Sequence, residues 1–232
     1  MAAGLNSAGL RANGNGMNGY FERLAAAYVR GMVPDQACGR SDADLLAVGR
    51  RAGLKLHRFK RTMDLPRVRA VLGVLRALNP SRLLDVGTGR GVFLWPLLDT
   101  FPDLEVTAVE RDERRRGHLE AVRRGGVERL HVIAADACCL PFVDDEFDVV
   151  TVLEVLEHQT DPVPLAQEVL RLAARFVVVS VPSKPDENPE HVQLFTAMTL
   201  EALLRQAGAA KVQKVQVDYV LNHMIAVVRV RP

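Results

Sequence analysis

The chain has 232 residues, of which 48% are hydrophobic, so it can bury the core of one domain with a modest appendage. Its formal net charge of +2 argues neither for nor against nucleic acid. Cys138 and Cys139 are adjacent and Cys38 lies far away, which excludes a disulfide framework and favours a reducing, cytoplasmic compartment. The apolar stretch at 176–183 is too short to cross a bilayer, and the N-terminus lacks the pattern of a secretory signal.

The first third of the chain predicts a tail and several helices. Residues 1–19 are rich in Gly and Asn and predict a disordered tail. Residues 20–64 have a helical but broken pattern, with interruptions expected at Gly31, Pro34 and Gly53. Residues 65–78 predict a stronger amphipathic helix, opened by Pro66 and closed before Asn79.

From residue 82 onward, apolar strand patterns alternate with helical ones. Strands are predicted at 82–86, 105–110, 130–136, 147–155 and 175–182, and helices at 91–101, 111–125, 162–174 and 199–208. This alternation indicates a parallel sheet with helices on both faces. The final strands, 211–220 and 221–230, follow each other too closely for a crossover and must pair antiparallel.

Three glycines follow the first predicted strand, where ligands bind in open parallel sheets. Gly87, Gly89 and Gly91 would let a ligand approach the backbone closely, although a tight turn without a ligand is an alternative. Asp85 precedes them, and Glu110 and Asp136 end the next two predicted strands. Carboxylates at three successive strand ends suit a ligand with a cationic head, a ribose and an adenine, which describes S-adenosylmethionine.

The motifs "LLDVGTGRG", "VTAVERD", "AADACCLPFVDDEFDVVTVLEVLEH" and "EHVQLFTAMTLEALLRQAGA" resemble those of the class I S-adenosylmethionine-dependent methyltransferases. The resemblance is to the small-molecule branch that includes ubiquinone and menaquinone biosynthesis enzymes, and it covers residues 65–231. It implies an α/β, Rossmann-like fold at 65–232, with seven mostly parallel strands, an antiparallel last strand and helices on both faces. Residues 20–64 fall where the family places a variable helical lid for substrate access.

The resemblance also implies roles for individual residues. Asp85, Gly87 and Gly89 would flank the methionine portion of the cofactor, Glu110 would hold the ribose, and Asp136 with Ala137 would frame the adenine. Thr88, Arg111 and Leu153 complete the set of expected cofactor-binding residues.

Candidates for work on the methyl acceptor follow the fourth strand and the fifth: Glu154, Glu157, His158 and His191. In one interpretation His158 and His191, with Glu157, act as a general base or orient the acceptor. In a second, the four residues bind Mg, Mn or Zn, a pattern that resembles the metal site of small-RNA 3′-end 2′-O-methyltransferases. Glu-His at this place is widespread in enzymes not known to need metal, and a structural role is a third possibility. The sequence leaves the ligands of such a metal unassigned.

Charge is distributed unevenly along the chain. Residues 50–82 hold ten Lys or Arg and one acid, whereas residues 136–161 hold eight acids and no Lys or Arg. The basic stretch is either a solvated helix face or a surface that meets an anionic substrate or RNA.

With 5% aromatic residues and no RNA-reading motif, we expect a small or medium organic acceptor, methylated on oxygen or nitrogen. A metal-assisted RNA 2′-O-methyltransferase and a catalytically silent cofactor-binding partner protein are the alternatives. A nicotinamide-dependent enzyme is disfavoured because Asp85 would face a pyrophosphate. The sequence predicts neither the acceptor nor the oligomeric state.

Overall fold

The computed structural model describes residues 21–61, 65–185 and 187–231. The predicted tail, residues 1–19, lies outside the described residues. None of the described helices is long and apolar enough to span a membrane. The three cysteines are free thiols.

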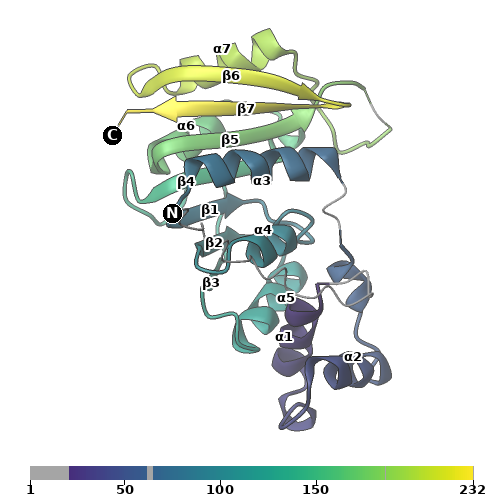
Figure 1. The fold of residues 1–232 in the computed structure, drawn as a ribbon. Helices are drawn as coiled ribbons and strands as arrows, with labels where there is room; N and C mark the ends of the chain where they lie inside the picture. The colour runs from purple at the N-terminus through teal and green to yellow at the C-terminus, as the bar shows by residue number, and fades with distance from the viewer. Residues whose placement is uncertain (1–20, 62–64, 186, 232) are drawn as a thin grey trace, which may run out of the picture.

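The described residues contain a seven-stranded sheet with the order β3-β2-β1-β4-β5-β7-β6 (Figure 1). Strands β1 to β5 pair in parallel, and β7 is antiparallel to both β5 and β6. This confirms the predicted sheet with an antiparallel last strand. The strands are β1 (Arg82–Val86), β2 (Glu105–Val109), β3 (Leu130–Ile133), β4 (Phe147–Leu153), β5 (Ala173–Pro182), β6 (Val212–Val220) and β7 (His223–Val230).

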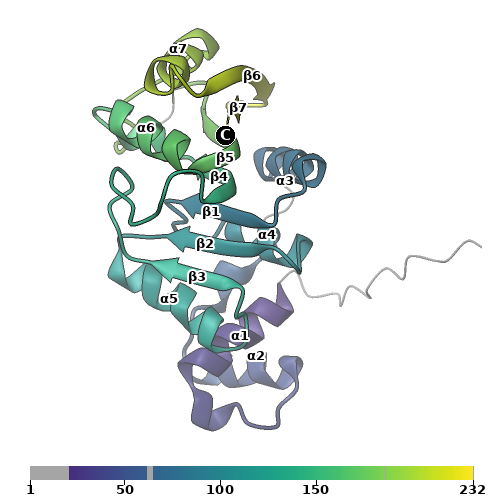
Figure 2. The same ribbon diagram turned by 90° about the vertical axis from the view of Figure 1, so that its left-hand side faces the viewer.

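Helices cover both faces of the sheet, because the central strands are apolar on both sides. Leu83 of β1 packs into the layer that contains α3 (Pro66–Leu78), α4 (Leu94–Thr100) and α5 (Glu113–Arg124). The next residue, Leu84, packs into the opposite layer with α6 (Val163–Leu172) and α7 (Ala197–Ala207). Figure 2 shows α6 and α7 on one side of the sheet and α3 and α4 on the other.

Several helices begin at polar residues that bind free backbone N–H groups. The side chain of Asp112 accepts from Arg115 N at the start of α5, and Thr196 forms a capping box with Thr199 at the start of α7. Helix α4 carries Pro96 in its first turn, where a missing N–H costs no hydrogen bond.

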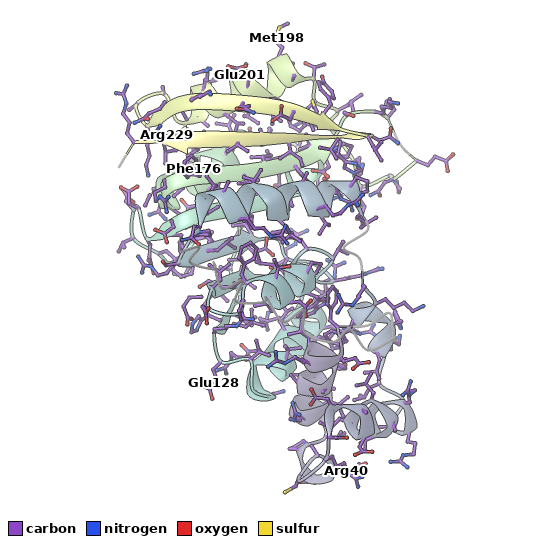
Figure 3. All side chains as sticks on the ribbon, viewed as in Figure 1. Arg40, Glu128, Phe176, Met198, Glu201 and Arg229 are labelled. Atoms are coloured by element: carbon purple, nitrogen blue, oxygen red, sulfur yellow. The ribbon has the colours of Figure 1, made fainter. Side chains whose placement is uncertain are left out.

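The segment before α3 contains α1 (Glu22–Met32), α2 (Asp42–Arg51) and two short 3₁₀ helices, η1 (Pro34–Gln36) and η2 (Leu56–Phe59). This segment lies at the end of the molecule beyond α5 (Figure 1). In Figure 3, Arg40 projects from this end and Met198 of α7 from the opposite end.

Helix α1 ends at Met32, one residue after Gly31, so the interruption expected there is confirmed to within one residue. Gly31 is where α1 crosses α5 closely: a Cβ there would lie 1.9 Å from the backbone oxygen of Ala121. On the other side of the crossing, a Cβ at Gly125 would lie 1.7 Å from the oxygen of Ala27. Gly31 therefore also serves helix packing.

Candidate active site

The glycine turn after β1 has the backbone that the sequence predicted. Gly87, Gly89 and Gly91 have φ angles of 75°, 61° and 81°, a region that L side chains rarely adopt. A Cβ at Gly91 would lie 2.2 Å from the ring of Trp95, and one at Gly87 would lie 2.6 Å from the side chain of Val155. Close packing therefore explains these two glycines. Above Gly89 the space is open, with nothing nearer than 3.8 Å.

Asp85 lies at the end of β1 and is 3% exposed. Its Oδ1 accepts a hydrogen bond from Thr151 Oγ1 at 2.7 Å, and its Oδ2 accepts one from Thr88 Oγ1 at 2.8 Å. Burial raises the pKa of Asp85 from 3.8 to about 6; the two hydrogen bonds oppose the rise and the charge of Glu110 adds to it. A cation placed beside Asp85 would restore its ionised form.

Glu110 directly follows β2 and is 4% exposed. Its Oε2 accepts a hydrogen bond from Gly89 N and its Oε1 accepts one from Asp112 N, both at 2.8 Å. The carboxylate thus ties the glycine turn to the start of α5. Arg111, the next residue, is exposed.

Asp136 does not end the third strand, contrary to the prediction. Strand β3 stops at Ile133 because its partner β2 stops at Val109, so the ladder has no further residues to pair. Asp136 is exposed in the following loop, where its Oδ1 accepts from Cys138 N at 2.9 Å, and Ala137 beside it is half-buried.

A cavity of about 190 Å³ opens at the carboxyl edge of β1, β4 and β5. Among the expected cofactor-binding residues, Asp85, Gly87, Thr88, Gly89 and Leu153 line it, whereas Glu110, Arg111, Asp136 and Ala137 do not. The cavity is smaller than most small-molecule sites, which span about 300–1,000 Å³. It can therefore hold only part of a nucleoside cofactor.

Several lining residues were not predicted as site residues: Arg67, Val68 and Val71 of α3, with Arg90, Val92, Phe93 and Ser180. The amphipathic pattern of α3 predicted a buried face but not a ligand under it. Arg67 belongs to the basic stretch at 50–82. This charge pattern was the sequence feature that could have indicated its place at the cavity.

Glu154 also lines the cavity and anchors a polar network there. Its Oε1 accepts a hydrogen bond from Ser180 Oγ at 2.5 Å, and its Oε2 lies 3.1 Å from His223 Nε2 and 3.8 Å from Arg67 Nε. Its φ of 57° turns the chain out of the line of β4.

The residues predicted for catalysis form a separate cluster. Glu157, His158 and His191 each offer a ligand atom, and these atoms lie within 4.8 Å of one another. The two imidazole rings are 4.8 Å apart at a steep angle, and His191 Nε2 is 4.0 Å from the fully buried Glu157 carboxylate. His158 Nδ1 is 2.9 Å from the carbonyl oxygen of Glu190.

This cluster lacks Glu154, so the four residues of the metal hypothesis do not form one ligand group in the described part of the chain. The left-handed turn at Glu154 sends its side chain toward β5 and β7, whereas the 3₁₀ helix η3 (Leu156–His158) carries the other two residues toward His191. The three clustered residues are not among those that line the cavity.

The predicted lid at 20–64 stays a prediction. Its described part packs mainly on α5, and the lining residues of the cavity begin with Arg67 of α3.

Comparison with known proteins shows which family this chain resembles. A family model described as a methyltransferase domain matches residues 56–214. The ubiquinone/menaquinone biosynthesis C-methyltransferase UbiE of Paracoccus denitrificans is 31% identical over 121 residues, which cover 50% of this chain and 48% of that enzyme. The 27-O-demethylrifamycin SV methyltransferase of Amycolatopsis mediterranei is 31% identical over 154 residues, covering 59% of this chain and 56% of that enzyme.

The chain thus spans about half the length of the curated relatives it matches. Among solved structures, a SAM-dependent methyltransferase from Aquifex aeolicus superposes with a TM-score of 0.58 over 72% of this chain and 92% of that one, at 18% identity. The chain therefore belongs to the methyltransferase domain family, and it has the fold of a SAM-dependent methyltransferase.

Proposed function

We propose that this protein transfers the methyl group of S-adenosylmethionine to a small or medium organic molecule, on oxygen or nitrogen. One observation carries the proposal: a single cavity joins the glycine turn and Asp85 to the polar network around Glu154. A methyl donor on one side and an acceptor on the other would meet there. The names of the relatives include both a C- and an O-methyltransferase, and the second of these supports an oxygen acceptor.

The glycine turn and Asp85 suit the cationic methionine portion of the cofactor. The open space above Gly89 admits a ligand close to the backbone, and buried Asp85 suits a cationic neighbour. Glu110 would accept from ribose hydroxyls, with Arg111 beside it. The loop at Asp136 and Ala137 would meet the adenine. When bound, the cofactor supplies an electrophilic methyl group on a sulfonium, and alignment and exclusion of water are left to the protein.

For the cluster of Glu157, His158 and His191 we propose a role in orienting or deprotonating the acceptor. A divalent metal held by these residues is the alternative, supported by the close approach of their ligand atoms. A chelator separates the two: activity that is lost with chelator and restored by Mn or Mg means a metal, and unchanged activity means base or orientation.

No finding favours an RNA substrate or a silent partner protein. Of the basic residues described between 50 and 82, Arg67 reaches the cavity, and it lies beside the carboxylate of Glu154. We also propose a cytoplasmic location, because all three cysteines are free thiols.

Isothermal titration calorimetry with S-adenosylmethionine, S-adenosylhomocysteine and NAD tests the proposal. We expect both adenosyl ligands to bind and to raise the melting temperature, because they bind the native state, and NAD to do neither. Glu110→Ala should weaken their binding by about 1.5–3 kcal/mol, the worth of hydrogen bonds to a charged group. Binding of NAD in preference to both adenosyl ligands would refute the proposed cofactor.

A further inference from the structure

Four segments far apart in the sequence bring polar groups to one end of the cavity. Glu154 follows β4, Ser180 is on β5, His223 begins β7 and Arg67 is on α3. Ser180 is 1% exposed and donates to Glu154, and the imidazole of His223 touches the other carboxylate oxygen. The carboxylate is thus held on two sides, while it still borders the cavity.

The backbone at Glu154 supports a dedicated role for this side chain. A φ of 57° is costly for a residue with a Cβ, and such residues persist where the surroundings enforce them, often at functional sites. Here the Glu154 N–H donates to Ser180 O at 2.9 Å, and the carboxylate reaches Ser180 of β5 and His223 of β7. The side chain is a quarter exposed, so the cavity reaches it.

The position in the sheet separates this end from the cofactor residues. Asp85 lies near the end of β1 and Glu110 follows β2. Glu154 follows β4, and Ser180 and His223 belong to β5 and β7, on the other side of β1. A molecule that meets a methyl group held above β1 from that other side would lie against Glu154.

Charge and polarity at this end indicate what would bind. Arg67 balances the charge of Glu154, which leaves no net charge when His223 is neutral. The walls between the two ends are apolar, formed by Val68, Val71, Val92, Phe93 and Leu153. An anion would face the fixed carboxylate, and a purely apolar molecule would displace water from the quarter-exposed carboxylate without offering it a donor.

We infer that Glu154 is the hydrogen-bond acceptor for the methyl acceptor, which is a neutral, largely apolar molecule carrying an O–H or N–H donor. The identification of the ligand as the methyl acceptor rests on the proposed function, whereas the binding site itself does not. Glu154 touches the ligand directly, and His223 and Arg67 are positioning residues that hold its carboxylate.

Phenol, anisole and benzoate serve as probes, because they share a ring and differ in the donor and in charge. Titrations are followed by the ¹⁵N resonances of His223, assigned with the His223→Gln variant, since a donor that binds Glu154 changes the hydrogen bond to the imidazole. We expect phenol to shift these resonances, anisole and benzoate to leave them in place, and His131 on the edge strand β3 to respond to none of the three. Glu154→Gln should weaken phenol binding at least about tenfold, as loss of a hydrogen bond to a charged group implies. Glu190→Gln, an exposed carboxylate on the nearby loop, should not.

Each other outcome overturns the inference. If phenol gives no response, Glu154 does not form this binding site. If anisole gives an equal response, the ligand does not need a hydrogen-bond donor. If benzoate gives a stronger response, the site does not prefer a neutral ligand. Repeating the titration with bound S-adenosylhomocysteine tests a rival occupant: if that ligand displaces phenol and loses affinity in Glu154→Gln, then Glu154 binds the cofactor instead. Failure of the wild type to bind any adenosyl ligand refutes the proposed function, while the phenol titration of the free protein still decides the inference.

Discussion

Asp85→Asn should stabilise the protein progressively as the pH rises. The folded-state pKa of Asp85 is about 6 against 3.8 without the fold, so the folded protein keeps a proton that the unfolded chain releases. The stability that protonated Asp85 contributes is therefore present below about pH 3.8 and is lost as the pH rises through about 6. This is the reverse of the usual behaviour of a carboxyl group, because burial outweighs the hydrogen bonds from Thr151 and Thr88.

The size of the effect follows from the two pKa values. Their difference corresponds to about 3 kcal/mol for a fully ionised group, at 1.36 kcal/mol per pKa unit. Between about pH 4.5 and 7.5, the free energy of unfolding of the wild type minus that of Asp85→Asn should fall by about 2 kcal/mol. Because Asp85 is 3% exposed, little of this is screened by solvent.

Urea unfolding at a series of pH values measures this difference directly. Asp103→Asn, at an exposed position, controls for the substitution itself and should show no such trend. A difference that is independent of pH, or that rises with pH, would show that hydrogen bonding and not desolvation dominates at Asp85. Adding a saturating sulfonium cofactor should reverse the trend, because a cation favours the ionised carboxylate.

Three further predictions concern packing, the glycine turn and a buried imidazole. Gly31→Ala should lower the melting temperature sharply, since its Cβ would overlap Ala121, whereas Gly117→Ala, with nothing within 4 Å, should stabilise helix α5 by about 0.5–1 kcal/mol. Glu110→Ala should cost about 1–3 kcal/mol in urea unfolding without any ligand, because its two backbone donors lose their acceptor. Burial, with the charge of Arg58 second, lowers the pKa of His118 to about 4. Stability should therefore fall as the pH drops from 6.5 toward 4, and His118→Gln should remove that part of the loss.

Each of these has an outcome that contradicts it. Equal melting temperatures for Gly31→Ala and Gly117→Ala would mean that the α1–α5 crossing is looser than described. A Glu110→Ala variant as stable as the wild type would mean that water replaces the carboxylate at both N–H groups. If the loss of stability at acidic pH is unchanged in His118→Gln, another group takes up the proton.

The sequence by itself determined the elements that depend on local pattern. Apolar strands alternating with helices predicted the parallel sheet, and the closeness of 211–220 to 221–230 predicted the antiparallel pair, because chain length alone limits the connection. The glycine turn and Asp85 could also be predicted from the sequence. The glycines with positive φ and the residue beside them lie within one short segment.

The tertiary structure decided everything that depends on distant segments meeting. The length of β3, and with it the place of Asp136, follows from where β2 ends. The role of Gly31 follows from helix α5, which no local pattern around Gly31 contains. Glu154 and Glu157 are three positions apart, yet one turns to His223 and the other to His191. The left-handed backbone at Glu154 and the pairing of β7 with β5 direct them apart, and both arise only when the sheet assembles.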